Sequence, residues 1–215
     1  MRNSFTIRYL ILVIPLFFGC RGPVKEGSIE VSSSSVSLHI GSEKYLAIDK
    51  KQSVVIWKGS NLLGSNSHTG YVSISKGELK IENGQLVDGI AEIDMNTIQD
   101  EKHQSNNGLV QHLKDPDFFD VKKFPFSTFI ISKSEPINAE ENIVKGNLTI
   151  KGITHPVTFP SKIETKNGIV KMSGKLVIDR TKWDVRYKSK KFFDLVADQT
   201  ISDSIEFNIK IVAKR

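Results

Sequence analysis

The chain has 215 residues, a net charge of +6 at neutral pH and a single cysteine, so an internal disulfide is excluded. The basic side chains are densest over residues 186–191, where a solvated surface is the simplest interpretation. No basic run is interleaved with stacking aromatic residues over any length, which argues against a nucleic-acid-binding protein. The mild positive charge is compatible with a position near an anionic membrane surface.

Residues 1–19 have the pattern of a lipoprotein signal peptide. Arg2 and Arg8 form a basic start, and the apolar stretch from Tyr9 to Phe18 is too short to span a bilayer as a helix. The stretch ends at Cys20, which resembles the cysteine that becomes the lipidated N-terminus of a bacterial lipoprotein. A plain signal peptide with a coincidental cysteine and an uncleaved anchor are the alternatives.

Residues 20–44 are rich in serine and poor in large apolar side chains, so they are interpreted as a lipidated tether. The expected location is the cell envelope, with the protein facing the periplasm. No acidic residue follows Cys20 directly, which favours the outer membrane over the inner membrane. Residues 45–215 then suit a single domain in length.

That domain alternates between apolar and polar residues in segment after segment. Residues 144–151 and 205–211 show the pattern most clearly, and one apolar face with one polar face is typical of a half-buried strand. Asn83-Gly84 and Asn167-Gly168 are strong hairpin signals. About eight strands joined mostly by short turns predict an all-β antiparallel sheet that closes into a barrel or folds into a sandwich.

One segment, residues 96–122, departs from strand patterning. Leu109, Val110 and Leu113 fit helical spacing, so a short helical insert is expected there. Phe118 and Phe119 follow it. Their rings either form an apolar lid over a cavity or simply close the hydrophobic core, and the sequence leaves both possibilities open.

Small residues recur on the faces that point inward. An eight-stranded barrel is near the size at which its interior either fills with side chains or encloses one small ligand. Small inward residues favour the second arrangement, and bulges or bends are the alternative role for the glycines. The residues concerned are Gly70, Gly89, Ala91, Gly146 and Gly174.

Several motifs in this order resemble those of the YceI-like family, over residues 45–215. They are Trp57, His68-Thr69-Gly70, Asp94-Met95-Asn96-Thr97-Ile98, residues 112–121, Phe124-Pro-Phe-Ser-Thr-Phe129, residues 146–157, and Asp179-Arg180. The resemblance implies an extended, lipocalin-like antiparallel β-barrel with an internal tunnel. It also implies a long isoprenoid or other amphiphilic lipid as ligand, and no general enzymatic activity.

The expected function is therefore membrane-anchored binding of a long apolar chain, such as a polyisoprenoid or a quinone, for transport, storage or sequestration. Phe118 and Phe119 would cover one mouth of the tunnel, with His112 or Arg180 near the head group. The expected ligand-binding residues are Trp57, Val72, Ile93, His112, Phe118, Phe119, Phe129, Leu148, Ile150, Val157, Met172, Leu176 and Arg180.

Neither catalytic nor metal-binding residues are expected. The five histidines show no paired spacing of the kind found in metal sites, and no nucleophile motif or phosphate loop is present. An enzyme acting on a small amphiphile in the same cavity is the alternative, using His68 or His112 with Asp94 or Asp115. A barrel packed solid is a third possibility. The expected partners are the lipid and the membrane, no cofactor is expected, and a homodimer is left open.

Overall fold

The computed structural model describes residues 36–39, 42, 44–102, 108–138 and 141–215. Residues Val31–Arg215 form one compact unit, which contains every described helix and strand. The strands are β1 (Tyr45–Ile48), β2 (Val54–Ser60), β3 (Ser67–Glu82), β4 (Gln85–Asp100), β5 (Phe126–Pro136), β6 (Glu141–Ile150), β7 (Ile153–Lys166), β8 (Ile169–Asp179) and β9 (Ser204–Lys214). The helices are α1 (Gly108–Lys114) and the 3₁₀ helix η1 (Arg180–Trp183).

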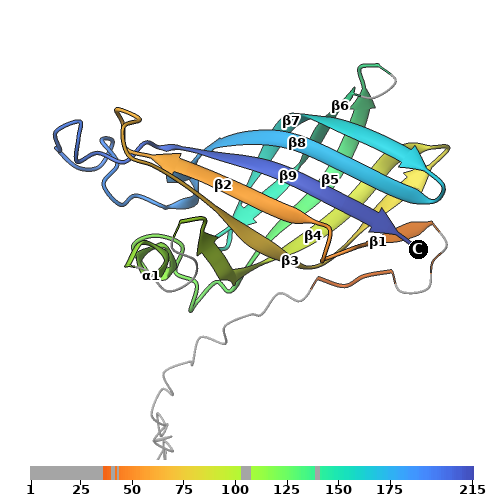
Figure 1. The fold of residues 1–215 in the computed structure, drawn as a ribbon, viewed down its shortest axis with the longest axis horizontal. Coiled ribbons are helices and arrows are strands. Elements are labelled where there is room, and N and C mark those ends of the chain that lie inside the picture. Colours follow the sequence, from red (N-terminus) through yellow and green to blue (C-terminus); the bar gives the residue numbers. More distant parts are fainter. Residues whose placement is uncertain (1–35, 40–41, 43, 103–107, 139–140) are drawn as a thin grey trace, which may run out of the picture. The chain divides into compact units, whose positions relative to one another are not determined.

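The strands form a closed antiparallel barrel (Figure 1). Going around it, the order is β3-β2-β9-β8-β7-β6-β5-β4, and β4 pairs with β3 to close the ring. β1 pairs with the same two strands as β2, namely β3 and β9, so the two share one place in the ring. Nine described strands therefore occupy eight positions, and the all-β barrel of about eight strands with a short helical insert is confirmed.

Three two-residue turns connect neighbouring strands. Asn83-Gly84, Lys151-Gly152 and Asn167-Gly168 all have positive φ at both residues, with values between 50° and 78°. This is the type I′ geometry, whose twist matches that of the flanking strands. The two Asn-Gly hairpin predictions are confirmed, and the third turn uses a lysine where asparagine is usual.

β3 and β4 are the longest described strands. β3 runs from Ser67 to Glu82, with register shifts that mark bulges against β4. β4 continues to Asp100, so the irregular segment begins at Glu101 and not at Asn96. The helix expected within it is present as α1.

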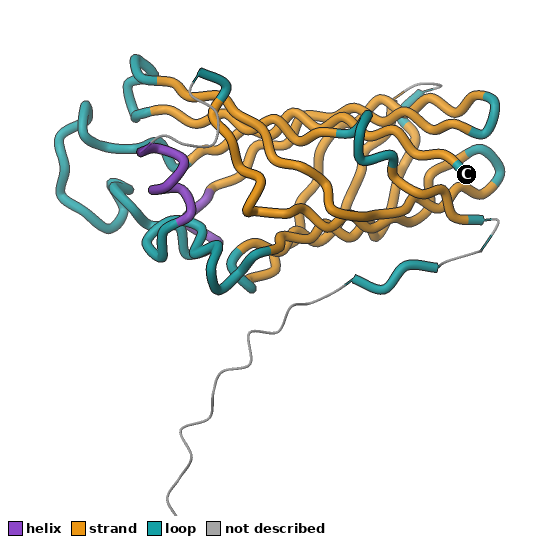
Figure 2. The backbone as a smooth tube through the Cα atoms, turned by 60° about the horizontal axis from the view of Figure 1, so that its bottom comes forward, coloured by secondary structure: helices purple, strands orange, loops and turns teal. Residues whose placement is uncertain are grey.

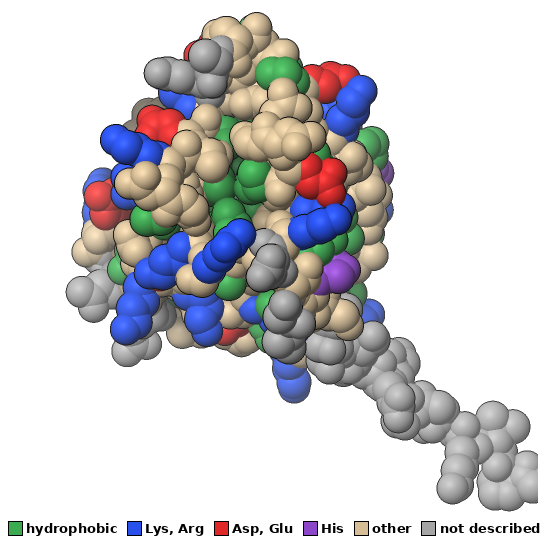
Figure 3. Space-filling model, turned by 90° about the vertical axis from the view of Figure 1, so that its right-hand side faces the viewer, with side chains coloured by type: hydrophobic (Ala, Val, Ile, Leu, Met, Phe, Trp, Pro, Cys, Tyr) green, Lys and Arg blue, Asp and Glu red, His purple; other side chains and the backbone are tan. Residues whose placement is uncertain are grey.

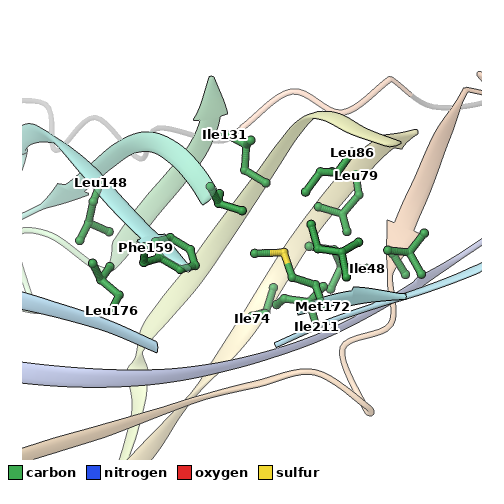
Figure 4. Close-up of a cluster of buried hydrophobic side chains, with 14 of the residues drawn as sticks. Ile48, Ile74, Leu79, Leu86, Ile131, Leu148, Phe159, Met172, Leu176 and Ile211 are labelled. Carbon is green, nitrogen blue, oxygen red and sulfur yellow. The ribbon is translucent and has the colours of Figure 1, made fainter. Parts of the chain in front are cut away.

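Two hydrophobic clusters form the core of the barrel. The first lies along most of the strands; in Figure 4 Phe159 lies beside Leu148 and Leu176, and Met172 lies beside Ile211. The second is built from β3, β4 and the segment around α1, with Val110 fully buried. Since both clusters lie within the compact unit, residues 31–215 contain a complete barrel with its own core.

The up-and-down order of the strands places the long connections at one end. Loop 61–66, the α1 segment and residues 180–203 gather there, while the other end carries short turns (Figure 2). The expected signal peptide and the lipidated Cys20 lie outside the described residues. Among the described residues, no helix has the length and apolar content needed to cross a membrane.

Candidate functional site

A cavity of about 520 Å³ runs inside the barrel. Its lining comes from most of the strands and is mainly apolar, from Ile48 and Leu79 near the short-turn end to Trp57 and Phe118 near the loop-rich end. Cavities of about 300–1,000 Å³ with apolar linings are typical small-molecule sites. The barrel is therefore not packed solid, which removes the third possibility raised by the sequence.

The cavity reaches the surface at the loop-rich end. The lining residues that are exposed are Asn66, Lys188, Asp198 and Gln199, and all four belong to loop 61–66 or to residues 184–203. At the other end the lining residues, such as Leu79 and Ile211, are buried. We call the opening between these two loops the mouth.

α1 and the turn after it form one wall near the mouth. Phe118 is buried in the second hydrophobic cluster, and Phe119 packs against both clusters. Their rings meet edge to face at 4.9 Å, and both line the cavity. The lid and the core interpretations therefore coincide, because the same rings bound the cavity on one side and complete the core on the other.

The expected ligand-binding residues come together, with one exception. Val157 does not line the cavity. It packs against the first cluster and lines a shallow recess where β7 and β8 separate, since these strands pair only from Ser161 onward. All the others line the cavity: Trp57, Val72, Ile93, His112, Phe118, Phe119, Phe129, Leu148, Ile150, Met172, Leu176 and Arg180.

The glycines do not create the space, contrary to expectation. Gly70, Gly89, Gly146 and Gly174 are not part of the lining, whereas Ala91 is. Aromatic rings from neighbouring strands occupy the space next to three of these glycines. A Cβ at Gly146 would lie 2.6 Å from the Phe129 ring, one at Gly174 would lie 2.8 Å from the Phe159 ring, and Trp57 covers Gly70. These glycines let the rings lie flat against the barrel wall.

Arg180 has a structural role at the mouth. Its guanidinium is fully buried and donates hydrogen bonds to the backbone carbonyls of Val185 (2.7 Å), Ser202 (3.0 Å) and Ile201 (3.2 Å). Asp203 lies 3.5 Å away as its counterion. Burial lowers the pKa of Arg180, against the opposing effect of the nearby carboxylates. These bonds hold both ends of residues 184–203, so the side chain is fixed by backbone carbonyls without a ligand.

Polar atoms without a partner remain close to the cavity. Trp57 Nε1 and His112 Nε2 are buried and have no hydrogen-bond partner among the described residues. Both side chains line the cavity near the mouth. A buried donor or acceptor left unpaired costs roughly 1–3 kcal/mol, so a ligand with a polar end would be stabilised here relative to a pure hydrocarbon.

The other nitrogen of His112 faces two carboxylates. His112 Nδ1 lies 3.6 Å from Asp115 Oδ2 and 4.0 Å from Asp117 Oδ1, and the three side chains are near enough to share a cation. Histidine spacing alone gave no hint of this cluster, because the turn after α1 supplies the carboxylates. Both carboxylates are exposed.

The enzyme alternative is only partly supported by positions. His68 and His112 both line the cavity, and His112 has Asp115 beside it, whereas Asp94 and Asp115 are not in the lining.

Several lining residues were not singled out from the sequence. The inward side chains of β9, Ile205, Phe207, Ile209 and Ile211, were visible as a clean alternation, but the polar mouth residues had no local signal.

Fold and site together define an antiparallel β-barrel with an apolar internal cavity that reaches the surface at its loop-rich end. The model of the YceI-like domain matches residues 46–213 of this sequence, and the chain belongs to that family. Protein YceI of Salmonella arizonae is 42% identical over 53 residues, and the UPF0312 protein YE1254 of Yersinia enterocolitica is 45% identical over 53 residues. Each match covers 25% of this chain and 27% of the relative, so only about a quarter of these proteins is matched.

Solved structures show the same fold. BcnA of Burkholderia cenocepacia superposes with a TM-score of 0.63 at 20% identity, covering 78% of this chain and 99% of that one. A polyisoprenoid binding domain from Saccharophagus degradans gives a TM-score of 0.60 at 11% identity, covering 80% and 98%. At such identities the likeness concerns the fold alone.

Proposed function

We propose that the protein binds a lipid with a long apolar chain, such as a polyisoprenoid or a quinone, inside the barrel. The observation that carries the proposal is the apolar cavity of about 520 Å³, open at one end. Each methylene removed from water contributes about 0.8 kcal/mol, so a long chain can bind tightly without directed contacts. The ligand named for the Saccharophagus degradans domain, a polyisoprenoid, is of this chemical class.

Polar groups near the mouth suit the head of such a lipid. The chain would lie along the strands, with its polar end beside Trp57 and His112, where their buried nitrogen atoms lack partners among the described residues. Arg180 already donates three hydrogen bonds to backbone carbonyls of residues 185–202, so we assign the head-group contacts to the other two side chains.

The proposed role is transport, storage or sequestration of the lipid, not its conversion. Cys20 would anchor the protein to a membrane, with the barrel in the periplasm and the outer membrane as the favoured site. Anchoring and location rest on the sequence pattern of residues 1–22 alone.

Native mass spectrometry of residues 31–215, purified without detergent, tests the proposal. We expect an added mass that organic solvent releases as a prenyl or acyl lipid carrying a polar group. A protein that stays bare after incubation with isoprenoids and quinones would refute lipid binding. A lipid recovered in chemically altered form, with the change dependent on His112 or His68, would favour the enzyme alternative.

Ala91→Phe locates the ligand. Ala91 lines the cavity between the two hydrophobic clusters, so a ring there should displace about four methylenes and weaken binding roughly 200-fold. Ile130→Phe is the matched control, because it adds the same ring at an exposed position on the neighbouring strand. If Ala91→Phe keeps its fold and binds lipid like the control, the lipid does not occupy this cavity.

A further inference from the structure

Exposed apolar side chains gather on the two loops that form the mouth. Leu62 and Leu63 lie on loop 61–66, and Phe192, Phe193 and Val196 lie on the longer loop. Each is between 46% and 64% exposed. Hydrogen bonds join the two loops, from Leu62 N to Thr200 O (2.8 Å) and from Ser202 N to Ser60 O (2.9 Å). The loops therefore present their apolar side chains on one continuous end of the barrel.

Basic side chains accompany these apolar residues. Arg186, Lys188, Lys190 and Lys191 are exposed and directly precede Phe192 and Phe193. Arg186 pairs with Asp184 at 2.6 Å, and Lys191 pairs with Asp179 at 2.6 Å. Among the ion pairs of the described residues, none involves Lys188 or Lys190. The segment thus offers positive charge without a carboxylate partner beside large apolar side chains.

We infer that the mouth surface, formed by Leu62, Leu63, Arg186, Lys188, Lys190, Phe192, Phe193 and Val196, docks onto the surface of an anionic bilayer. Lysines beside exposed aromatic and aliphatic residues are the combination that binds the lipid–water interface, because the apolar groups enter it while the charges meet anionic head groups. Large exposed apolar groups on a soluble protein mark interaction sites.

The position of the mouth selects a bilayer as the occupant. Lys188 belongs both to the docking surface and to the exposed cavity lining. Docking there would set the cavity opening directly against the lipid, so a chain could pass between bilayer and barrel without crossing water. This consequence rests on the proposed lipid binding, but docking itself does not.

Among the described residues, the opposite end lacks this combination. Figure 3 shows hydrophobic side chains near the middle of that end, with charged side chains of both signs around them. Its cavity-lining residues such as Leu79 and Ile211 are buried, and large exposed apolar side chains described there are Ile137, after β5, and Ile169, at the start of β8. Positive charge alone therefore does not distinguish the two ends, whereas the apolar loops and the open mouth do.

Sedimentation with vesicles tests the inference. Residues 31–215 should bind vesicles of equal parts phosphatidylcholine and phosphatidylglycerol, and bind pure phosphatidylcholine vesicles more weakly. The double variant Phe192→Ser/Phe193→Ser should lower the vesicle partition at least roughly tenfold. Lys188→Gln/Lys190→Gln should lower it roughly thirtyfold on the anionic vesicles and little on the neutral ones.

Matched controls lie away from the mouth. Ile137→Ser/Ile169→Ser removes two exposed apolar side chains at the opposite end (58% and 39% exposed), and Lys166→Gln/Lys171→Gln removes two exposed lysines. Both controls should bind like the parent. Equal losses in control and mouth variants, or no vesicle binding by the parent, would overturn the inference.

Two additional measurements distinguish bilayer docking from lipid binding and from self-association. Native mass spectrometry of Phe192→Ser/Phe193→Ser should show the same bound lipid as the parent, so a failure of docking is distinguishable from a failure of lipid binding. Analytical ultracentrifugation tests a second copy as occupant. A concentration-dependent dimer that this variant abolishes, with no vesicle binding by the parent, would assign the surface to self-association instead.

Discussion

Replacing Arg180 with methionine should loosen the mouth and destabilise the whole domain. The guanidinium is 1% exposed and supplies three hydrogen bonds to loop carbonyls, at 2.7 to 3.2 Å, as well as the ion pair with Asp203. Methionine restores much of the side-chain volume but none of the donors. The carbonyls of Val185, Ile201 and Ser202 then lose a charged partner.

The magnitude follows from these contacts. Hydrogen bonds to a charged group contribute about 1.5–3 kcal/mol each, and removing one member of a buried ion pair costs about 3–5 kcal/mol. The loop is close to solvent, so water can replace part of what is lost. We therefore expect Arg180→Met to lower the free energy of unfolding by about 3 kcal/mol.

Urea denaturation measures this change, and hydrogen exchange locates it. The amides of Ile201 and Ser202, which bond to Lys188 O and Ser60 O, should lose protection before the barrel strands do. Arg186→Met is the control, because Arg186 is 58% exposed and has a single described ion pair, so its loss should cost less than about 1 kcal/mol. Equal losses of unfolding free energy in the two variants would refute the stabilising role assigned to the hydrogen bonds of Arg180.

Two other outcomes follow from particular contacts. Gly70→Ala should cost about 1–3 kcal/mol of stability, because its Cβ would collide with the Trp57 ring and a backbone carbonyl. Gly59→Ala is the control, because there is open space around Gly59, and it should cost less than about 1 kcal/mol. Equal denaturation midpoints for the two variants would contradict this prediction. The pKa of Asp179 is lower than its ordinary value, since burial raises it but hydrogen bonds, the strongest from Lys191, lower it more. Its contribution is therefore complete above about pH 3.8 and is lost as the pH falls further. Asp179→Asn should reduce the loss of stability measured between about pH 5 and pH 2, and an unchanged pH profile would contradict this assignment.

Much of the fold could be predicted because its signals are local. Alternation along residues 144–150 and 205–211 places the apolar side chains on the inner face, and the Asn-Gly pairs adopt the positive φ values that their turns need. The helix at residues 108–114 was likewise visible in the spacing of Leu109, Val110 and Leu113. Such patterns depend only on the repeat of strand or helix and on the conformations that asparagine and glycine tolerate.

The cavity depended on contacts between distant residues. Inward positions were identified largely correctly, yet Gly70, Gly146 and Gly174, which were expected to open the interior, are covered by the rings of Trp57, Phe129 and Phe159. Arg180 was expected beside a head group, but its donors are taken by carbonyls up to 22 residues further along the chain. A sequence indicates which face of a strand a side chain occupies, but not which residues from other strands and loops contact it.

The mouth was decided by tertiary structure alone. Residues 61–66 and 184–203 are far apart in the sequence, and each by itself looks like an ordinary polar loop with a few apolar side chains. β2 and β9 pair in the ring, and this brings the two loops together and places Leu62 beside the basic, aromatic segment. Alternation fixed the inner face of the barrel, whereas closure of the ring fixed which loops share an end, because strand pairing is set by long-range contacts.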